Sequence, residues 1–473
     1  MSALSAIAAS GLLYYFSTNL GTLWPVAWIA PAPVLWYALG HYRPVRAALV
    51  AFAAFFAGQI ALVPVYWTIV PVGTLLVALA IPAAAFAGVV FLTGRYGRAL
   101  PPAAGILLFP ALWTAWEYVF SLFSPNGTFL SVAYSQVPFL TIIQVASVAG
   151  MAAITFLVSL PAASIAFLLR VKPLRLSYAV VPMCLLMLAL GFGTVSLLRS
   201  DTAPRVRVGL AARDGSRLGY GTTDRSVAVE AAGAYAQAIE ELARRGVEVV
   251  LLPEACVTLR PEWEADVRTF LSEIASSARV LVVIGFDEFL PDGTRRNVAE
   301  VISRTGSLVG RYVKHRHLPG QDYEVGAEIL ELPGRVGVSI CKDLDFPALG
   351  LRYSQAGTGL LLVPAWDFGK DGRLHSQMAW LRGVEGGYAV ARCAVQGLLS
   401  VTDSKGAPVA VSESGSATEV LLSASVRIGP GNTLYARTGD IFAIACVLLA
   451  AGIVVSAELW RNRKQHRRAT AQL

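Results

Sequence analysis

Cys341, Glu254 and Lys314 are residue types that together can form and break a covalent acyl intermediate, and each follows a short, mostly apolar run of the chain. Such runs, bounded by polar residues, predict buried β-strands. In an α/β sheet, ligands bind at the carboxyl ends of the strands. A thiol, a carboxylate and an amine at three such ends therefore indicate nucleophilic catalysis with Cys341 as the nucleophile, rather than a cysteine that only packs in a core.

The elements that must position these residues alternate between strand and helix patterns. Helices are predicted at 223–245, 262–277 and 373–385. Strands are predicted at 205–211, 248–253, 279–285, 297–303, 307–313, 335–340, 359–364, 388–393, 397–402 and 419–427. This alternation predicts an α/β sandwich over residues 205–430.

The rest of the chain has the composition of a membrane protein. Of the 473 residues, 55% are hydrophobic and only 15% are charged, which is unusual for a soluble protein of this length. Eight apolar runs are long enough, or nearly so, to cross a bilayer core that requires about 20 helical residues. They cover residues 4–20, 23–40, 47–69, 72–93, 102–123, 138–169, 178–198 and 441–459. We therefore expect a membrane domain of seven transmembrane helices at 1–200 and an eighth helix at 439–460.

Basic residues in this part of the chain occur in alternate connections between the apolar runs. They are Arg43, Arg46, Arg95, Arg98, those within 170–175 and those within 461–468. Because cytoplasmic loops of membrane proteins are enriched in Lys and Arg, the amino terminus and the basic tail 461–473 are expected in the cytoplasm. Seven helices then bring residue 200 to the opposite side, so the catalytic domain is expected outside the cytoplasm.

The net charge of +8 comes from these membrane-flanking segments, and the segment 205–430 is close to neutral. A nucleic-acid partner is therefore not expected, because phosphates require a basic face on the binding domain itself. The five cysteines show no paired spacing, which argues against a disulfide framework. His315 and His317 are spaced like metal ligands but have no third ligand nearby in sequence, so we expect neither a metal nor a cofactor.

The order of the three candidate residues resembles the nitrilase, or carbon-nitrogen hydrolase, superfamily. The matching pieces are LLPE ending at Glu254, YVK ending at Lys314, GVSIC ending at Cys341, and later pieces at 364–366, 375–385 and 401–406. The resemblance covers residues 206–427 and implies a nitrilase-like αββα sandwich with a Glu-Lys-Cys triad. It implies that Glu254 is the general base, that Lys314 stabilises the oxyanion and that Cys341 carries the acyl group.

A nitrilase-like domain between seven membrane spans and one further span resembles the apolipoprotein N-acyltransferase family. The stretches 129–136 and 433–440 also look like loops of that family. The resemblance implies a multi-pass protein of the bacterial inner membrane with a periplasmic catalytic domain. Its implied partners are a phospholipid acyl donor and a lipoprotein acceptor, whose amino-terminal amine receives the acyl chain.

The chain departs from the pattern of that family beside the triad. The family has HLVPFGE after the lysine, whereas this chain has HRHLPGQDYE, so the second essential glutamate corresponds to Glu324 or to Asp322, with Glu324 preferred. Lys342 and Asp343 replace an aromatic-acid pair after the nucleophile. A second amine there either shares the electrostatic role of Lys314 or disturbs the lid over the lipid. These changes affect the expected substrate more than the expected reaction.

Glu117 is a single carboxylate within the apolar run 102–123. A carboxylate inside a membrane is costly, which makes it a candidate functional residue. Its place toward the outer end of the run is equally consistent with an interfacial, hydrogen-bonded residue.

Two other classes of function remain open from the sequence. A membrane-tethered amidase or nitrilase that hydrolyses a small periplasmic nitrogen compound fits the same triad. A transporter or a non-catalytic scaffold fits less well, because a transporter is expected to place polar or broken segments near the middle of the bilayer, where the apolar runs offer little besides Glu117.

Overall fold

The computed structural model describes residues 1–17, 20, 23–41, 43–170, 176–199, 202–213, 220–415 and 418–470, with the backbone alone for 460–470. The chain forms two compact units. We call Met1–Phe123, Thr128–Ser196 and Asp440–Leu473 the helical unit, and Ser124–Gly127 with Leu197–Gly439 the α/β unit. The short segment Ser124–Gly127 thus packs with the α/β unit although it directly follows a helix of the other unit.

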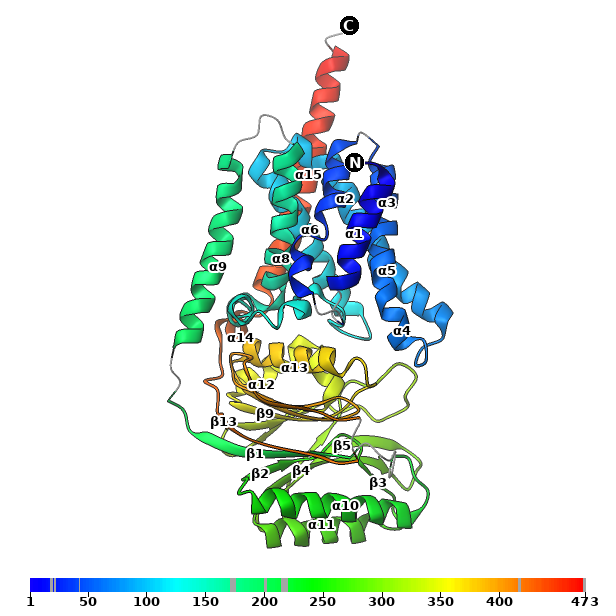
Figure 1. Ribbon diagram of the computed structural model, residues 1–473, viewed down its shortest axis with the longest axis vertical. Coiled ribbons are helices and arrows are strands. Elements are labelled where there is room, and N and C mark those ends of the chain that lie inside the picture. Colours follow the sequence, from blue (N-terminus) through cyan, green and yellow to red (C-terminus); the bar gives the residue numbers. More distant parts are fainter. Residues whose placement is uncertain are drawn as a thin grey trace. The chain divides into compact units, whose positions relative to one another are not determined.

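The helical unit consists of apolar helices joined by short turns (Figure 1). Its α-helices are α1 (Ala3–Ser17), α2 (Ala32–Gly40), α3 (Pro44–Gln59), α4 (Val63–Tyr66), α5 (Val72–Tyr96), α6 (Pro102–Phe123), α7 (Leu140–Ile143), α8 (Ala146–Arg170), α9 (Val180–Leu198) and α15 (Ile441–Thr470). Aromatic rings form its centre, where Phe86 contacts Phe55, Phe109 and Trp113. In Figure 1, α9 lies to one side of the other helices of this unit.

Within the described residues, six helical segments are long and apolar enough to cross a membrane. They correspond to six of the eight predicted runs. The first run forms only the 15-residue helix α1, and the second forms a 3₁₀ turn, η1 (Trp24–Trp28), and the nine-residue α2. Prolines at 25, 31 and 33 divide the second run, because proline lacks the N–H that would continue a helix. That these two runs cross the membrane remains a prediction.

The predicted run at 138–169 is also divided. The short α7 comes first, and a break at Ala149 and Gly150, where Gly150 has φ +67°, precedes the continuous part of α8. The predicted basic connection at 171–175 lies outside the described residues, as do the side chains of 461–468. The orientation derived from those residues therefore stays a prediction.

The α/β unit has four layers, helices on sheet on sheet on helices (Figure 1). One sheet has the order β13-β1-β2-β4-β5-β6, with β3 paired to β4, and the other has the order β12-β11-β10-β9-β8-β7. Helices α10 (Arg225–Arg244) and α11 (Glu264–Ala278) cover the first sheet, and α12 (Pro347–Ala356) and α13 (Gly372–Gly386) cover the second. The predicted fold class, a polytopic helical membrane domain with an αββα sandwich, is confirmed.

The strands of the two sheets agree closely with the prediction. They are β1 (Arg205–Ala212), β2 (Val249–Leu251), β3 (Val257–Leu259), β4 (Leu281–Phe289), β5 (Arg295–Ile302), β6 (Leu308–Val313), β7 (Leu330–Leu332), β8 (Val336–Val338), β9 (Leu360–Trp366), β10 (Ala389–Val395), β11 (Leu398–Thr402), β12 (Pro408–Glu413) and β13 (Val420–Arg427). Between the sheets lie fully buried aliphatic side chains such as Leu210, Leu251, Leu362 and Leu399. This core fixes the strand ends that carry the candidate residues.

Several described elements of the α/β unit were not predicted, among them β3, β7, β12 and α12. Strands β3 and β7 have three residues each and, unlike the equally short β2 and β8, do not lie within a longer apolar run. Strand β12 is an exposed edge strand that begins with a proline. Helix α12 does carry a recognisable signal, because Pro347 occupies its first turn and Gly357 caps it with φ +93°. Proline at the start and glycine just past the end are the expected boundaries of a helix.

Candidate active site

The structure brings Glu254, Lys314 and Cys341 together. The Lys314 ammonium donates a hydrogen bond to Glu254 Oε1, and both side chains are buried. The charges of both act on the Cys341 thiol. The three residues lie beyond the ends of β2, β6 and β8, as the sequence predicts, and two of these strands belong to one sheet and the third to the other. The site therefore forms only when the two sheets pack.

Glu254 is held by three elements that the sequence did not connect to it. Asn297 in β5 donates from Nδ2 to Glu254 Oε1 at 2.6 Å, and the Glu254 N–H donates to the Ala365 carbonyl at 3.4 Å. A Cβ at Gly285 in β4 would overlap the Pro253 carbonyl and Glu254 Cα. The carboxylate thus has a fixed position, and Gly285 provides the space for its backbone.

Lys314 is an ammonium ion in a buried place. Its N–H donates to the Asn297 carbonyl at 2.9 Å, and its own carbonyl accepts from Gly326 at 3.0 Å. Burial by itself lowers the pKa of Lys314, but the charges of Glu254, Cys341 and Asp343 together outweigh the burial and raise the pKa above the ordinary value. The residue therefore remains a cation throughout the physiological pH range.

Cys341 starts a 3₁₀ turn, η6 (Cys341–Asp345), with φ +41°. A positive φ is rare for a residue with a side chain and costs energy, and such strain concentrates at functional sites. Its Sγ donates to the Trp366 carbonyl at 3.5 Å. Burial raises the pKa of the thiol, and Glu254 raises it further, whereas Lys314 and Arg392 oppose the rise. Cys341 is therefore a thiol at rest, and a thiol must lose its proton before it can act as a nucleophile.

Arg392 and Asp367 are two further charged residues at the nucleophile, and the sequence analysis missed both. The Arg392 guanidinium lies 3.9 Å from Cys341 Sγ. It donates to both carboxylate oxygens of Asp367, at 2.8 Å and 2.5 Å, and to Ser376 Oγ at 3.3 Å. Arg392 is 1% exposed and Asp367 is fully buried. An arginine within the otherwise apolar run of β10 was the available signal, since a buried charge requires a partner.

Asp343 fixes the loop that follows Lys314. Its carboxylate accepts from the Tyr312 hydroxyl at 2.7 Å, from the Arg316 N–H at 2.7 Å and from the His315 N–H at 3.1 Å. Burial raises the pKa of Asp343 to about 7, although Lys314 and these hydrogen bonds oppose the rise. The turn η6, which begins at Cys341 and is called the nucleophile turn below, is thereby connected to the strand end that carries Lys314.

Lys342 is also buried, and its ammonium is bound away from the triad. Nζ donates to Asn126 Oδ1 at 2.7 Å and lies 3.9 Å from Asp345 Oδ2. Burial lowers the pKa of Lys342, and the nearby cation Lys314 lowers it further, although Asp345 opposes both. Asn126 belongs to the segment Ser124–Gly127, so Lys342 connects that segment to the nucleophile turn.

Glu324 and Asp322 lie on the loop after Lys314, and in none of the described contacts does either touch the triad. Glu324 pairs with Arg296 at 2.6 Å, with its side chain 43% exposed, and Asp322 is exposed. Tyr323 between them points inward, where its hydroxyl donates to Asp287 Oδ1 at 3.1 Å and its ring stacks on His317.

Throughout the described residues no group of three or more His, Cys, Asp or Glu side chains could hold a metal ion.

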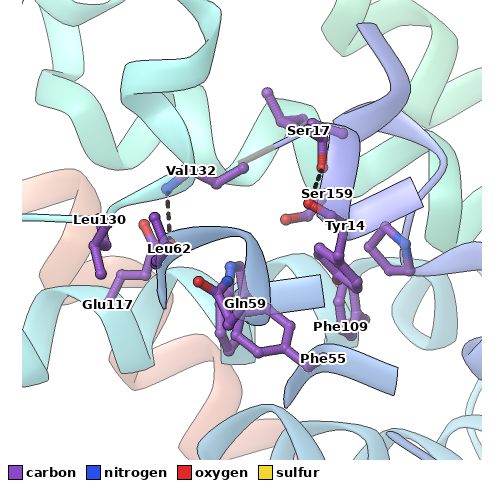
Figure 2. A pocket seen from close by; sticks show the side chains of 14 residues that line it. Tyr14, Ser17, Phe55, Gln59, Leu62, Phe109, Glu117, Leu130, Val132 and Ser159 are labelled. Atoms are coloured by element: carbon purple, nitrogen blue, oxygen red, sulfur yellow. Dashed lines mark hydrogen bonds between the residues drawn. The ribbon is translucent and has the colours of Figure 1, made fainter. Parts of the chain in front are cut away.

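Glu117 lies in the helical unit, where it lines a cavity of about 50 Å³ (Figure 2). Its carboxylate accepts from Ser131 Oγ at 2.6 Å, from Thr155 Oγ1 at 2.7 Å and from the Val132 N–H at 3.1 Å. Each oxygen therefore has a protein partner. This arrangement favours the interpretation of Glu117 as a hydrogen-bonded residue that holds the turn at 131–132 against α6 and α8.

Both halves of the chain match known protein families. Residues 10–164 match the family described as the apolipoprotein N-acyltransferase N-terminal domain, and residues 229–418 match the carbon-nitrogen hydrolase family. The chain is 28% identical to the apolipoprotein N-acyltransferase of Geobacter metallireducens over 508 aligned positions, which cover 97% of this chain and 95% of that protein.

Other relatives match only part of the chain. The deaminated glutathione amidase of Mus musculus is 28% identical over 160 positions, covering 28% of this chain and 50% of that protein. A solved structure of an amidase from Nesterenkonia, of the nitrilase superfamily, is 19% identical with a TM-score of 0.41, covering 51% of this chain and 96% of that one.

Most of the α/β unit thus matches the carbon-nitrogen hydrolase family, and the helical unit has the long apolar helices of a multi-pass membrane protein. The similarity to an apolipoprotein N-acyltransferase extends over nearly the whole chain, and one family model matches within each unit.

Gly127 provides a test of how tightly the segment Ser124–Gly127 packs on the nucleophile turn. It has φ +53°, and a Cβ there would collide with the Asp345 carbonyl. Gly127→Ala is expected to lower stability by more than the roughly 1–2 kcal/mol that a left-handed alanine costs, and to change the alkylation rate of Cys341. Gly293→Ala is the matched control, because Gly293 has φ +86° with no atom within 4 Å of the added Cβ. Equal thermal unfolding of both variants in detergent would contradict the packing described here.

Glu117 provides a second test. Glu117→Ala leaves two hydroxyls and one N–H without their acceptor, and is expected to cost about 1–3 kcal/mol for each donor that stays buried and unpaired. Glu117→Gln keeps an amide oxygen and is expected to lose less. Thermal unfolding of the detergent-solubilised protein measures both. If Glu117→Gln abolishes activity without any loss of stability, Glu117 has a chemical role and the anchoring interpretation is wrong.

Proposed function

We propose that this protein is an N-acyltransferase that moves an acyl chain from a phospholipid, through a thioester on Cys341, to the amino-terminal amine of lipoproteins. One observation carries the proposal, namely that the similarity to an apolipoprotein N-acyltransferase covers 97% of the chain and therefore both units. The amidase relative, by contrast, matches 28% of the chain. A membrane unit of this size is needed for a lipid substrate and not for a small soluble amide.

The first half-reaction forms the thioester. Glu254 accepts the Cys341 proton, and the thiolate attacks the ester carbonyl of the phospholipid. Lys314 stabilises the oxyanion that develops on the carbonyl oxygen. The carbon–oxygen bond of the ester then breaks, and the departing alkoxide takes the proton from Glu254. The lysophospholipid leaves, and the acyl group remains on Sγ.

The second half-reaction transfers the acyl group to nitrogen. The amino-terminal amine of the acceptor attacks the thioester, Glu254 accepts a proton from the amine, and the carbon–sulfur bond breaks as the thiolate recovers that proton. The products are an amide and the resting thiol. Because one product leaves before the second substrate reacts, the kinetics are expected to be ping-pong.

The charged residues around the triad have supporting roles in this proposal. Asp343 positions the backbone after Lys314, and Lys342 holds Asn126 and the segment to which it belongs. Glu324 is the preferred candidate for the second acidic residue of the family, and Asp322 is the alternative. Both lie on the loop after Lys314, which would have to close over the bound substrate for either to reach it.

We further propose that the protein lies in the bacterial inner membrane with its α/β unit in the periplasm. The alternation of basic connections along the sequence supports this orientation, and the resemblance to the apolipoprotein N-acyltransferase family implies the same compartment.

Acyl transfer is tested by the mass of the protein after incubation with phospholipid. The wild type is expected to gain one acyl group that neutral hydroxylamine removes, because hydroxylamine cleaves thioesters under conditions that spare amides. Cys341→Ala is expected to gain none. Lys314→Met is expected to slow adduct formation on the order of a hundredfold or more, as loss of an oxyanion donor does, and Glu254→Gln is expected to slow it because the thiol then has no base.

The buried thiols Cys256 and Cys393 are the matched controls, and Cys256→Ala and Cys393→Ala are expected to acylate like the wild type. If the wild type forms no lipid adduct but releases ammonia from small amides or nitriles in a Cys341-dependent way, the acyltransferase proposal fails. The chain is then a membrane-tethered carbon-nitrogen hydrolase.

The proposed orientation is tested with reporter fusions. An alkaline phosphatase fused after residue 430 is expected to be active, because the enzyme folds only outside the cytoplasm, and one fused after residue 465 is expected to be inactive. A green fluorescent protein at the same two positions is expected to give the opposite pattern. Finding residue 430 in the cytoplasm would overturn both the compartment and the substrate proposed here.

A further inference from the structure

Cys341 has two cations near its thiol, Lys314 and Arg392. The Arg392 guanidinium is the side-chain donor closest to Cys341 Sγ in the described hydrogen bonds, at 3.9 Å. It comes from β10, in the sheet that also contains β8, whereas Lys314 and Glu254 come from the other sheet. The thiol is therefore flanked by two ion pairs, Lys314 with Glu254 and Arg392 with Asp367.

The two ion pairs differ in how their cation is held. Lys314 is paired with Glu254, the residue that must accept the thiol proton, so its partner loses its charge during the reaction. Arg392 is paired through two parallel hydrogen bonds with Asp367, which takes no proton in the proposed mechanism. Bidentate pairs of this kind fix the guanidinium plane as well as its position. Arg392 thus keeps the same place in every state of the reaction.

We propose that Arg392 is a further catalytic residue, which stabilises the Cys341 thiolate, and that Asp367 positions it. This inference rests on the acyl-transfer function proposed above. When the proton moves from Sγ to Glu254, the site contains one thiolate, one neutral acid, two cations and the Asp367 carboxylate, so its net charge does not change. The negative charge has moved from Glu254, which Lys314 had neutralised, to Sγ, where Arg392 lies within hydrogen-bonding distance.

Arg392 also acts when the thioester breaks. As the amine attacks, the carbon–sulfur bond gives its electron pair to Sγ, and a stabilised thiolate is the better leaving group. Burial of the thiol favours its neutral form, and Arg392 and Lys314 together oppose that effect. A purely structural ion pair in the sheet would serve neither step.

A double substitution separates the two roles. Arg392→Met alone leaves Asp367 as a buried unpaired charge and is expected to destabilise the fold. Combined with Asp367→Leu, it replaces a buried ion pair by apolar side chains of similar size, which is often neutral for stability. The full-length double variant in detergent is expected to unfold near the wild-type temperature. Its Cys341 is expected to be alkylated by iodoacetamide about tenfold more slowly at pH 8 than in the wild type, with the pH midpoint raised by about one unit.

The matched control is another buried ion pair of the same unit, Arg382 with Glu385 in α13, at 2.5 Å and with both side chains at most 3% exposed. The Arg382→Met, Glu385→Leu variant removes an equivalent pair and is expected to keep the wild-type alkylation profile. Arg392→Lys keeps the positive charge and is expected to restore part of the lost rate. The ratio of alkylation by anionic iodoacetate to that by neutral iodoacetamide is expected to fall only where the Arg392 charge is lost.

The inference is overturned if Cys341 in the folded Arg392→Met, Asp367→Leu variant is alkylated at the wild-type rate and with the wild-type pH midpoint. It is also overturned if alkylation in the Arg382→Met, Glu385→Leu control is slowed by the same factor. If the double variant does not fold, the Arg392→Lys variant decides. Slower alkylation of Cys341 with an unchanged ratio of iodoacetate to iodoacetamide alkylation supports the electrostatic role of Arg392. A lowered ratio in this variant, which keeps the positive charge, overturns that role. Alkylation uses no lipid, so it tests Arg392 separately from acyl transfer. If alkylation changes as expected but no lipid adduct forms, the role of Arg392 in stabilising the thiolate is supported and the acyltransferase function is rejected.

Discussion

The burial of opposite charges around one thiol is the constraint on which the rest of the α/β unit depends. Removing a carboxylate or an ammonium from water costs several kcal/mol per ion unless a partner and further hydrogen bonds offset the cost. Glu254 meets this condition with Lys314 and Asn297, and Asp367 meets it with Arg392. The partners of each pair come from different strands of one sheet, and the two pairs meet at the thiol only when the two sheets pack in the folded sandwich. The site therefore assembles together with the core and does not exist in either sheet alone.

The backbone around the site is tightly packed and partly strained. Cys341 and Ala255 have positive φ although both carry a Cβ, and Gly285 has no room for one. Asp343 and Lys342 each tie the nucleophile turn to another segment, the first to the strand end at Lys314 and the second to Asn126. The strain at Cys341 persists because these contacts over-determine its position. A nucleophile fixed in this way needs little reorganisation when the thiolate forms.

The sequence predicted the triad because each of its members ends a recognisable apolar run, and an acid, an amine and a thiol in that context have a known chemistry. It did not predict Arg392, Asp367 or Asn297, because their significance depends on partners in neighbouring strands that are far away in sequence. The predicted strands of the sandwich were right to within a few residues, whereas the three-residue strands β3 and β7, which do not lie within a longer apolar run as β2 and β8 do, showed no pattern. In the helical unit, hydropathy identified the six long apolar helices of the described residues but did not show that prolines divide the second run or that Gly150 interrupts α8.

The two ion pairs also explain why a thiol suits this chemistry although burial raises its pKa. A thiolate that persisted at rest would add a negative charge to a site whose charges balance, and the fold would have to compensate it permanently. Transfer of the proton to Glu254 instead creates the thiolate only while Glu254 is neutral, so the total charge of the buried site stays constant. The proposed thioester is neutral as well, and in the proposed mechanism Glu254 gives its proton to the leaving alcohol, so the acyl-enzyme has the same balance of charges as the resting enzyme. Each chemical state is then compatible with the same set of buried partners, and the reaction can pass through all of them without rearranging the strands that hold the site.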